Sequence, residues 1–421
     1  MKKTLNNYTL YIEDADRWVK DCQEDCCINE ETKVQIIKSG IILPLILPLK
    51  NDARNSCGMG GVCDVNGIFV AGHKTWKSQD GPGITVSRAY PIPSEINSSK
   101  ETVVYGGLVY NHFGHFITEC LSRMWWFLEN PTCGYKFVFI TPENHPDDSR
   151  FLEYFLLLGL AKENIIVLRK PTRFDLIIIP DQSIYIHSGY KPNATKIYNV
   201  IRKNVPAAGY EKVYFTRTKL HRPDAVNEEY FESYFHSKGY EVIAPEKLSI
   251  EEQVAVMAGV KEYACVSGSL HHHILFGRNG IKITVLNRSR SALCYTMRWI
   301  NQAKQAISTY VDASMNFLPH APSNSLYLLA PNAYWKSYIK DYFNDYLSNN
   351  ISINKDKILE YIEKWCQMMA TFDVFSLSRH TEMTCLDFII KFHRYYYNNE
   401  LEETTKKRLR EAFPYLNDSR N

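Results

Sequence analysis

The sequence predicts an α/β protein in which two α/β domains face each other across a cleft, followed by a C-terminal helical extension. Short apolar strands alternate with helices over 212–286, a pattern typical of a parallel, Rossmann-like sheet. A less regular alternation of the same kind fills 103–204. Beyond about Met315 the chain changes to long, aromatic-rich amphipathic stretches, which indicate helices that pack against other surfaces.

The first half is expected to hold a hairpin and one α/β unit. Asn66 and Gly67, at the centre of an apolar stretch over 62–71, indicate the hairpin turn. The unit is expected to contain strands at 103–108, 136–140, 165–168 and 176–179, helices at 115–128 and 150–158, and a connecting helix at 194–204.

The second half has the cleaner pattern. Ser249 with Glu252 three residues later is a capping box, which begins a helix, and Gly239 and Gly277 are typical helix stops. The expected strands are 212–216, 240–244, 263–266 and 281–286, and the expected helices are 227–238, 249–258 and 270–276. The extension is expected to contain helical stretches at 334–347, 355–369 and 384–397.

Composition narrows the class of protein. The 421 residues carry a net charge of only +3, which disfavours nucleic acid as the main partner because a phosphate backbone demands a concentrated excess of Lys and Arg. The eleven cysteines are scattered, as expected for reduced thiols in a cytosolic protein. No secretory signal is expected, and the apolar run at 41–49 is too short, and too broken by proline, to span a bilayer. Peripheral attachment to a membrane stays open.

Ionisable residues form a stripe on the helix that follows the strand at 103–108. His112, His115, Glu119 and Arg123 are spaced by three, four and four residues, which places them on one face of a regular helix. The other positions are mostly apolar, and a helix that starts at the carboxyl edge of a sheet lies where α/β proteins bind ligands. The stripe therefore predicts an acid/base site. A partly exposed stripe with internal ion pairs is the structural alternative.

Basic residues follow the first strand of the second domain. Arg217, Lys219, His221 and Arg222 come directly after 212–216 and before a helix, a position suited to holding a diphosphate. A solvated charged loop is the alternative.

A turn of small residues, Ser267-Gly268-Ser269, follows the strand at 263–266 and lets backbone N–H groups approach a phosphate. His271 and His272 are expected to contact phosphate, ribose or sugar hydroxyls. Consecutive histidines diverge by about 100° around a helix, so we expect no metal site from them. Asp14 and Asp16 receive no metal role, and no P-loop, dinucleotide fingerprint, zinc helix or nucleophile elbow is present.

Over about 103–331 the chain resembles glycosyltransferase family 61. The likeness rests on the helix motif Gly114, His115, Phe116, Glu119, Leu121 and Arg123, on Phe215-Thr216-Arg217 followed by Asn227-Glu228, and on Glu252-Gln253 before the small-residue turn. Where the family usually reads Gly-Pro-His-Gly-Ala, this chain reads Cys265-Val266-Ser267-Gly268-Ser269, so Ser267 stands in the histidine slot.

The resemblance implies a GT-B fold of two Rossmann-like domains. It implies an acceptor-side domain at 1–204, a nucleotide-sugar-binding domain at 205–315 and a helical extension at 316–421. The expected function is inverting, metal-independent sugar transfer from a nucleotide-sugar, a UDP-sugar being the expected donor, to a glycan hydroxyl in capsular or surface polysaccharide synthesis. Bacterial members of family 61 occur in that setting. The resemblance therefore implies a cytoplasmic enzyme, with peripheral attachment at the inner face of the membrane left open.

Roles follow residue by residue. His115 and Glu119 are expected to be base and orienter, in either order. Asn111, His112 and Arg123 are assigned to the acceptor cleft. The expected donor-binding residues are Arg217, Lys219, Arg222, Glu252, Ser267, Gly268, Ser269, His271 and His272. A non-catalytic sugar-binding scaffold of the same fold is the competing interpretation, and an epimerase is weakened because no cofactor fingerprint is present.

Overall fold

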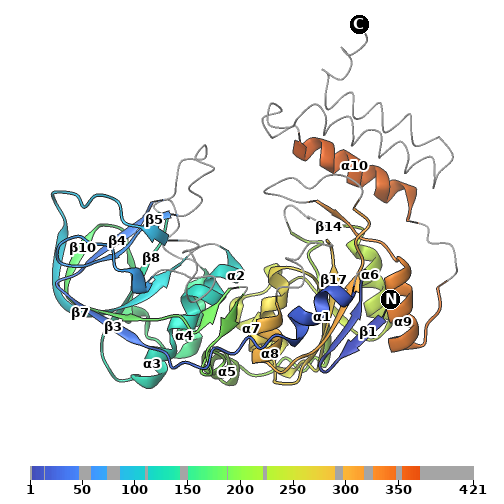
Figure 1. Cartoon of the computed structure of the whole chain (residues 1–421), viewed down its shortest axis with the longest axis horizontal. Helices are drawn as coiled ribbons and strands as arrows, with labels where there is room; N and C mark the ends of the chain where they lie inside the picture. The colour runs from blue at the N-terminus through green and yellow to red at the C-terminus, as the bar shows by residue number, and fades with distance from the viewer. Residues whose placement is uncertain are drawn as a thin grey trace, which may run out of the picture.

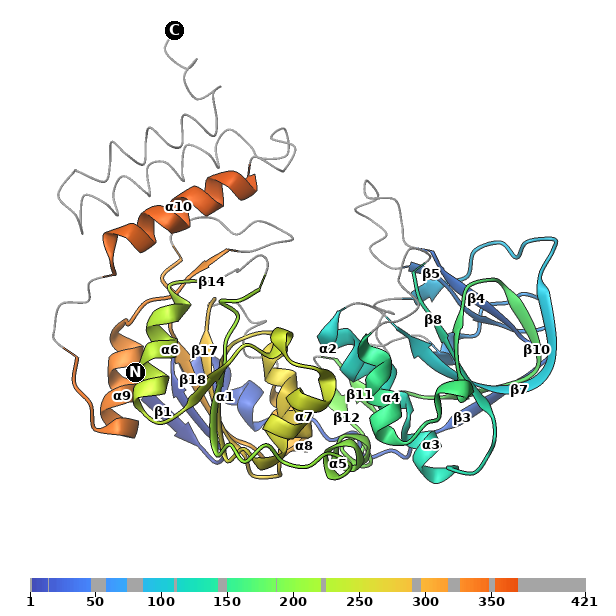
Figure 2. The ribbon, with the colours of Figure 1, turned by 180° about the vertical axis from the view of Figure 1, so that it is seen from behind.

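The computed structural model describes residues 2–13, 15–46, 58–73, 86–109, 112–142, 150–186, 188–220, 225–289, 297–316, 326–347 and 353–369. The α-helices are α1 (Ala15–Gln23), α2 (Phe113–His115), α3 (Trp125–Glu129), α4 (Glu153–Leu158), α5 (Lys196–Lys203), α6 (Glu228–Ser237), α7 (Ile250–Gly259), α8 (Arg298–Ala303), α9 (Ala333–Phe343) and α10 (Lys355–Met369). Two β-sheets lie side by side with α2, α4, α5, α7 and α8 between them (Figure 1), and the reverse view agrees (Figure 2).

The first sheet holds β3 (Val34–Lys38), β4 (Ile41–Ile46), β5 (Gly58–Cys63), β6 (Val86–Arg88), β7 (Asn97–Leu108), β8 (Lys136–Ile140), β9 (Ile165–Leu168) and β10 (Thr172–Pro180). Its order is β6-β5-β4-β10-β7-β8-β9, with β3 also on β10. Strands β10, β7, β8 and β9 are parallel, whereas β3 and β4 run antiparallel to β10. The predicted hairpin turn is confirmed by the Val70 N–H, which donates to Val62 at 2.9 Å.

The second sheet holds β1 (Lys2–Leu5), β2 (Tyr8–Tyr11), β13 (Lys212–Phe215), β15 (Glu241–Ile243), β16 (Glu262–Val266), β17 (Lys282–Asn287) and β18 (Ile307–Asp312). Its order is β1-β2-β18-β17-β16-β13-β15, and every neighbouring pair except β1 with β2 is parallel. The chain passes from β13 outward to β15 and then back across to β16. The strand order therefore reverses between β13 and β16, the place where open α/β sheets bind ligands. These parallel strands confirm the α/β class.

Two segments lie elsewhere than the predicted ranges suggest. Strand β2 pairs with β18, so the start of the predicted 1–204 unit completes the second sheet. Helix α9, in the predicted 316–421 extension, packs Trp335 and Ile339 into the core on the second sheet. Strand β2 buries its apolar side chains by extending this sheet beside β18, and α9 buries its own against a face of the sheet. The stretch at 384–397 lies outside the described residues.

The helix predicted at 115–128 is broken into short pieces. After α2 come a π-helical turn, η2 (Phe116–Cys120), a 3₁₀ turn, η3 (Leu121–Arg123), and then α3. Further 3₁₀ turns are η1 (Ala71–His73), η4 (Arg150–Leu152), η5 (Lys162–Asn164), η6 (Pro245–Lys247) and η7 (Ser269–Phe276). Two small strand pairs complete the fold, β11 (Ile184–Tyr185) with β12 (Gly189–Tyr190) and β14 (Ala225–Val226) with β19 (Tyr327–Leu328).

One apolar core joins the two sheet units. The Phe116 ring stacks on Phe151 at a centroid distance of 5.1 Å, and Tyr154 of α4 stacks on Phe276 of η7 at 5.2 Å. Aromatic rings bury large areas, so these contacts hold the helices between the sheets together. No helix within the described residues has both the length and the apolar character needed to cross a bilayer.

Candidate functional site

The helical segment after β7 brings two of the predicted site residues into contact. His115 Nδ1 lies 2.6 Å from Glu119 Oε1. The Glu119 side chain is only 2% exposed, whereas that of His115 is 29% exposed. A buried carboxylate on one ring nitrogen fixes the orientation of an imidazole and stabilises its protonated form. The other ring nitrogen of His115 is then suited to exchanging a proton with a ligand.

A π-helical turn sets the direction of Glu119. The N–H of Leu121 bonds to the carbonyl of Phe116, five residues back, and Glu119 lies inside this widened turn. The hydroxyl of Tyr198, on α5, donates to the Ile117 carbonyl at 2.8 Å. Short π segments recur at functional sites because they redirect side chains that a regular helix would place elsewhere.

His112 lies beside this pair. Its ring centroid is 4.5 Å from that of His115. Burial, followed by the neighbouring His115, lowers the pKa of His112, and Arg217 of the second unit adds to that lowering. Asn111, predicted beside it, lies outside the described residues.

Arg123 does not share the surface of the other stripe residues. It is 1% exposed, and its Nη1 donates to the Pro180 carbonyl at 2.6 Å, at the end of β10. Burial lowers the pKa of its guanidinium. The structure thus places Arg123 in the core beneath the helix, where it ties the helix to the sheet, and not in an open cleft.

The predicted anion residues of the second unit gather at the switch point of its sheet. Arg217 follows β13 by two residues, and Gly268 follows the adjacent β16 by two residues. A Cβ added to Gly268 would lie 3.8 Å from Arg217 Nη1, so the guanidinium lies against this turn. Gly268 has φ +133°, a conformation that other residues rarely adopt. Ser267, buried beside it, accepts a hydrogen bond from the Arg288 N–H at 3.3 Å.

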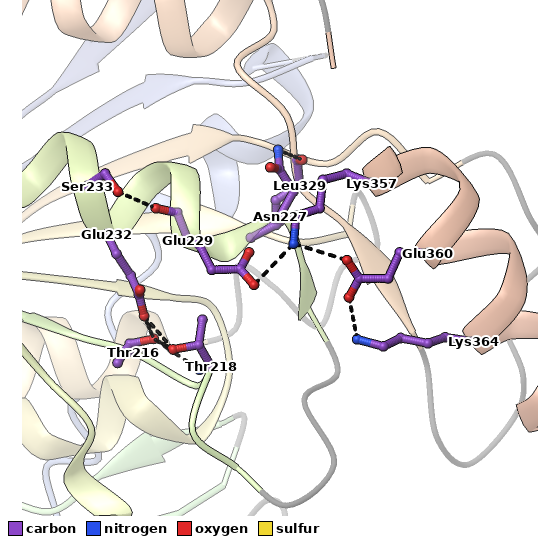
Figure 3. Close-up of polar contacts among 10 residues, drawn as sticks. All are labelled: Thr216, Thr218, Asn227, Glu229, Glu232, Ser233, Leu329, Lys357, Glu360 and Lys364. Atoms are coloured by element: carbon purple, nitrogen blue, oxygen red, sulfur yellow. Dashed lines mark hydrogen bonds and ion pairs between the residues drawn. The ribbon is translucent and has the colours of Figure 1, made fainter. Parts of the chain in front are cut away.

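The turn after β13 is braced from α6 (Figure 3). The hydroxyls of Thr216 and Thr218 both donate to one carboxylate oxygen of Glu232, and Asn227 donates to the Leu329 carbonyl at 2.9 Å. Lys219 is exposed in this turn, and Arg222 lies outside the described residues. The bracing fixes the backbone from which the Arg217 side chain extends.

The three consecutive histidines are buried and have separate partners. His271 Nε2 lies 2.7 Å from Asn301 Oδ1, His272 Nδ1 lies 3.1 Å from the Ser269 carbonyl, and His273 Nε2 lies 3.1 Å from Gln253 Oε1. Burial lowers their pKa values to about 4, about 3 and about 4, so all three are neutral at pH 7. Their nitrogens do not converge, and the described part of the chain holds no group of three potential metal ligands.

Glu252 has a structural contact of its own. Its carboxylate accepts from the Ser249 N–H at 2.7 Å, and the Ser249 hydroxyl accepts from the Glu252 N–H at 3.1 Å. The predicted capping box is confirmed. The side chain that was assigned to donor binding is thus engaged in capping the N-terminus of α7.

Two residues at this edge were not predicted as site residues. Glu228 is fully buried, and its Oε1 accepts from the Tyr214 hydroxyl and the Arg217 N–H, each at 3.1 Å. Burial raises its pKa to about 8. Arg288 follows β17 by one residue, and its Nη2 would lie 3.1 Å from a Cβ on Gly268. Their positions in the sequence were the available signal. Arg288 follows a strand that ends at this edge, and Glu228 is the first residue of the helix that comes after β13 and β14.

The two groups of residues meet where α2 packs on η7. The Phe113 ring stacks on His273 at a centroid distance of 4.4 Å. A Cβ on Gly114 would lie 3.2 Å from His272, so a glycine permits this close approach. The helical segment that carries His115 and Glu119 and the turn that carries Gly268 therefore belong to elements in direct contact.

Residues 113–284 match the family model described as Glycosyltransferase 61. The protein is a glycosyltransferase. The match supports the predicted resemblance to family 61, and an enzyme of this class takes a sugar donor and an acceptor. The matched part of the glycosyltransferase contains His115, Glu119, Arg217 and Gly268, whereas Arg288 lies beyond it. A comparison with curated proteins gives no match.

Proposed function

We propose that this glycosyltransferase is an inverting, metal-independent enzyme that moves a sugar from a nucleotide-sugar to a hydroxyl of a glycan acceptor. The observation that carries the proposal is the packing of α2 on η7, which joins a proton-accepting pair to an arginine-lined turn. Transfer of a sugar needs both functions within one site, because a proton leaves the acceptor while negative charge develops on the leaving diphosphate.

His115 is the general base in this proposal, and Glu119 orients it. The carboxylate of Glu119 is buried, whereas His115 retains an exposed edge that an acceptor hydroxyl can reach. The acceptor oxygen attacks the anomeric carbon on the face opposite the leaving group, and its proton passes to Nε2 of His115, the ring nitrogen that does not face Glu119. The bond from the anomeric carbon to the diphosphate oxygen breaks with its electron pair on that oxygen, so the product configuration is inverted.

Fixed cations and backbone N–H groups stabilise the leaving diphosphate. Arg217 lies against Gly268, where η7 begins without a side-chain cap on its first N–H groups. A cation and a helix start together favour a bound anion, which supports donor binding in the second unit without a metal ion. The separate partners of the three histidines also favour a metal-free site.

The wider setting belongs to the same proposal. The two sheet units correspond to the two Rossmann-like domains of a GT-B enzyme, with the acceptor on the first and the donor, a UDP-sugar, on the second. The expected role is capsular or surface polysaccharide synthesis in the cytoplasm or at the inner face of the membrane. The parallel second sheet, with its switch point at the arginine-lined turn, supports the donor assignment.

A donor panel tests the reaction. The purified protein is incubated with UDP-, GDP-, dTDP-, ADP- and CMP-sugars and glycan acceptors, and released free nucleotide is measured. His115→Ala and Glu119→Gln should each lower turnover by about 100-fold or more. His236→Ala removes an exposed histidine of α6 and is the matched control. Near-wild-type rates for both site variants would contradict the base assignment, and binding without release would indicate a scaffold.

Donor placement and metal independence have their own measurements. Arg217→Ala should weaken nucleotide binding by about 1.5–3 kcal/mol in calorimetry, the scale of one charged hydrogen-bonding partner. Arg278→Ala, which removes an exposed arginine that precedes β17, is the control. Turnover should persist in excess EDTA. Loss of turnover in EDTA, restored by one divalent ion, would refute the metal-free mechanism.

A further inference from the structure

Arg288 approaches Gly268 from β17, whereas Arg217 approaches it from β13, the strand on the other flank of β16. In the second sheet β16 lies between β17 and β13, and these three strands lead into Gly268, Arg288 and Arg217 respectively. A Cβ on Gly268 would be 3.1 Å from Arg288 Nη2 and 3.8 Å from Arg217 Nη1. Two guanidinium groups from flanking strands therefore meet at one glycine.

Several contacts hold Arg288 in this position. Its N–H donates to the Ser267 hydroxyl at 3.3 Å, and its carbonyl accepts from Asn316 Nδ2 at 2.8 Å. Its guanidinium carbon lies 4.4 Å from the centroid of the Tyr327 ring. A guanidinium held in this way by an aromatic face loses less conformational freedom when a ligand binds. Ser267, in the slot where the family usually has histidine, contributes one of these contacts.

The neighbouring carboxyl of Glu228 does not cancel this positive charge at pH 7. The group is fully buried, and burial raises its pKa to about 8, so it is mainly protonated. The nearby carboxylate of Glu232 accepts hydrogen bonds from the Thr216 and Thr218 hydroxyls, so its partners are these threonines and not the two arginines. Two like charges brought to one point repel each other and favour an anion with two charged groups between them.

We propose that Arg288 is a second donor-binding residue, which binds the nucleoside diphosphate of the donor together with Arg217, beside Gly268. This inference rests on the proposed function. It also specifies the donor class: a diphosphate offers two phosphoryl groups to the two guanidiniums, whereas a nucleoside monophosphate offers one. When the bond between the anomeric carbon and the diphosphate oxygen breaks, the electron pair stays on the diphosphate, and both arginines stabilise it. The proton of the acceptor goes to His115.

The test is calorimetric titration of the full chain with UDP, GDP, dTDP and ADP and with the corresponding monophosphates. Arg288→Ala should weaken the best-bound diphosphate by about 10- to 100-fold, and its monophosphate by under about threefold. Arg278→Ala removes an exposed arginine at the other end of β17 and should change neither affinity. Arg288→Lys keeps a charge without the forked guanidinium and should give an intermediate loss for the diphosphate.

The outcomes separate this inference from the proposed function. If Arg217→Ala weakens diphosphate binding and Arg288→Ala does not, Arg288 is no ligand, while the donor site stands. Equal losses for diphosphate and monophosphate would also overturn the diphosphate grip. If the wild-type protein binds no nucleotide in the panel, the proposed function fails first. Thermal melting of each variant verifies folding, and Arg288→Lys supplies the result if Arg288→Ala does not fold.

Discussion

Glu228→Gln should change how the stability of the protein depends on pH. Glu228 is fully buried, and its pKa is raised from 4.5 to about 8. The folded protein therefore holds a proton that the unfolded chain releases. This contribution to stability is fully present below pH 4.5 and is lost as the pH rises through 8. At about 1.36 kcal/mol per pKa unit, the loss amounts to roughly 4–5 kcal/mol across this window.

Glutamine resembles the protonated carboxyl and does not titrate. The variant should match the wild type near pH 5 and exceed its free energy of unfolding by roughly 3–5 kcal/mol near pH 8. Urea denaturation of both proteins at several pH values measures the difference. Glu229→Gln is the matched control, because the Glu229 side chain is 52% exposed and pairs with Lys357 at the surface (Figure 3). Parallel pH curves for wild type and Glu228→Gln would refute the argument.

Three further variants test other contacts. Burial lowers the pKa of Lys304 from 10.5 to about 7, so the folded protein loses stability as the pH falls and the unfolded chain takes up this proton more readily. Lys304→Met should therefore raise the free energy of unfolding by roughly 2–4 kcal/mol at pH 7 and by less near pH 10. Urea denaturation at both pH values measures the difference. Tyr198→Phe should lower the free energy of unfolding by about 1–2 kcal/mol, because the Ile117 carbonyl loses its hydrogen-bond donor, and the rate of sugar transfer should fall as well. A normal rate would show that Tyr198 does not help to orient Glu119. Gly268→Ala should weaken nucleotide binding in calorimetry, because its Cβ would displace Arg288 Nη2 from 3.1 Å and its φ of +133° suits glycine. Gly239→Ala, with φ +81° but no atom within 4 Å, should strain the backbone and leave binding intact.

Local signals predicted much of the fold and several residues of the candidate site. The strands at 136–140 and 165–168 match β8 and β9, because apolar runs of this length bounded by polar residues have few alternatives. Arg217 and Gly268 were found because a residue at the carboxyl end of a parallel strand is placed by the topology alone. Such predictions need only neighbouring residues and the strand order.

What escaped prediction depends on partners far along the chain. The face shared by His112, His115, Glu119 and Arg123 assumed a regular helix, and the π turn shifts everything after it by about 100°. One contact to that turn comes from Tyr198, some eighty positions later, so no local pattern records it. From the sequence, Glu228 was assigned only to a family motif. The reason for a carboxyl at this position is its hydrogen bonds from the Tyr214 hydroxyl and the Arg217 N–H, which only the structure shows.

The pairing of β2 with β18 has a consequence for how the protein is made. Tyr8 is aligned with Ser308, so β2 cannot pair with β18 until the ribosome has synthesised about three hundred further residues. At about 5–20 residues per second this delay lasts roughly 15–60 s. During that time Leu10 and Ile12, both fully buried in the finished protein, have no sheet to cover them, and a two-stranded hairpin is marginal alone. The second sheet thus closes only after β18 has been synthesised, and until then β1 and β2 are open to chaperones and proteases.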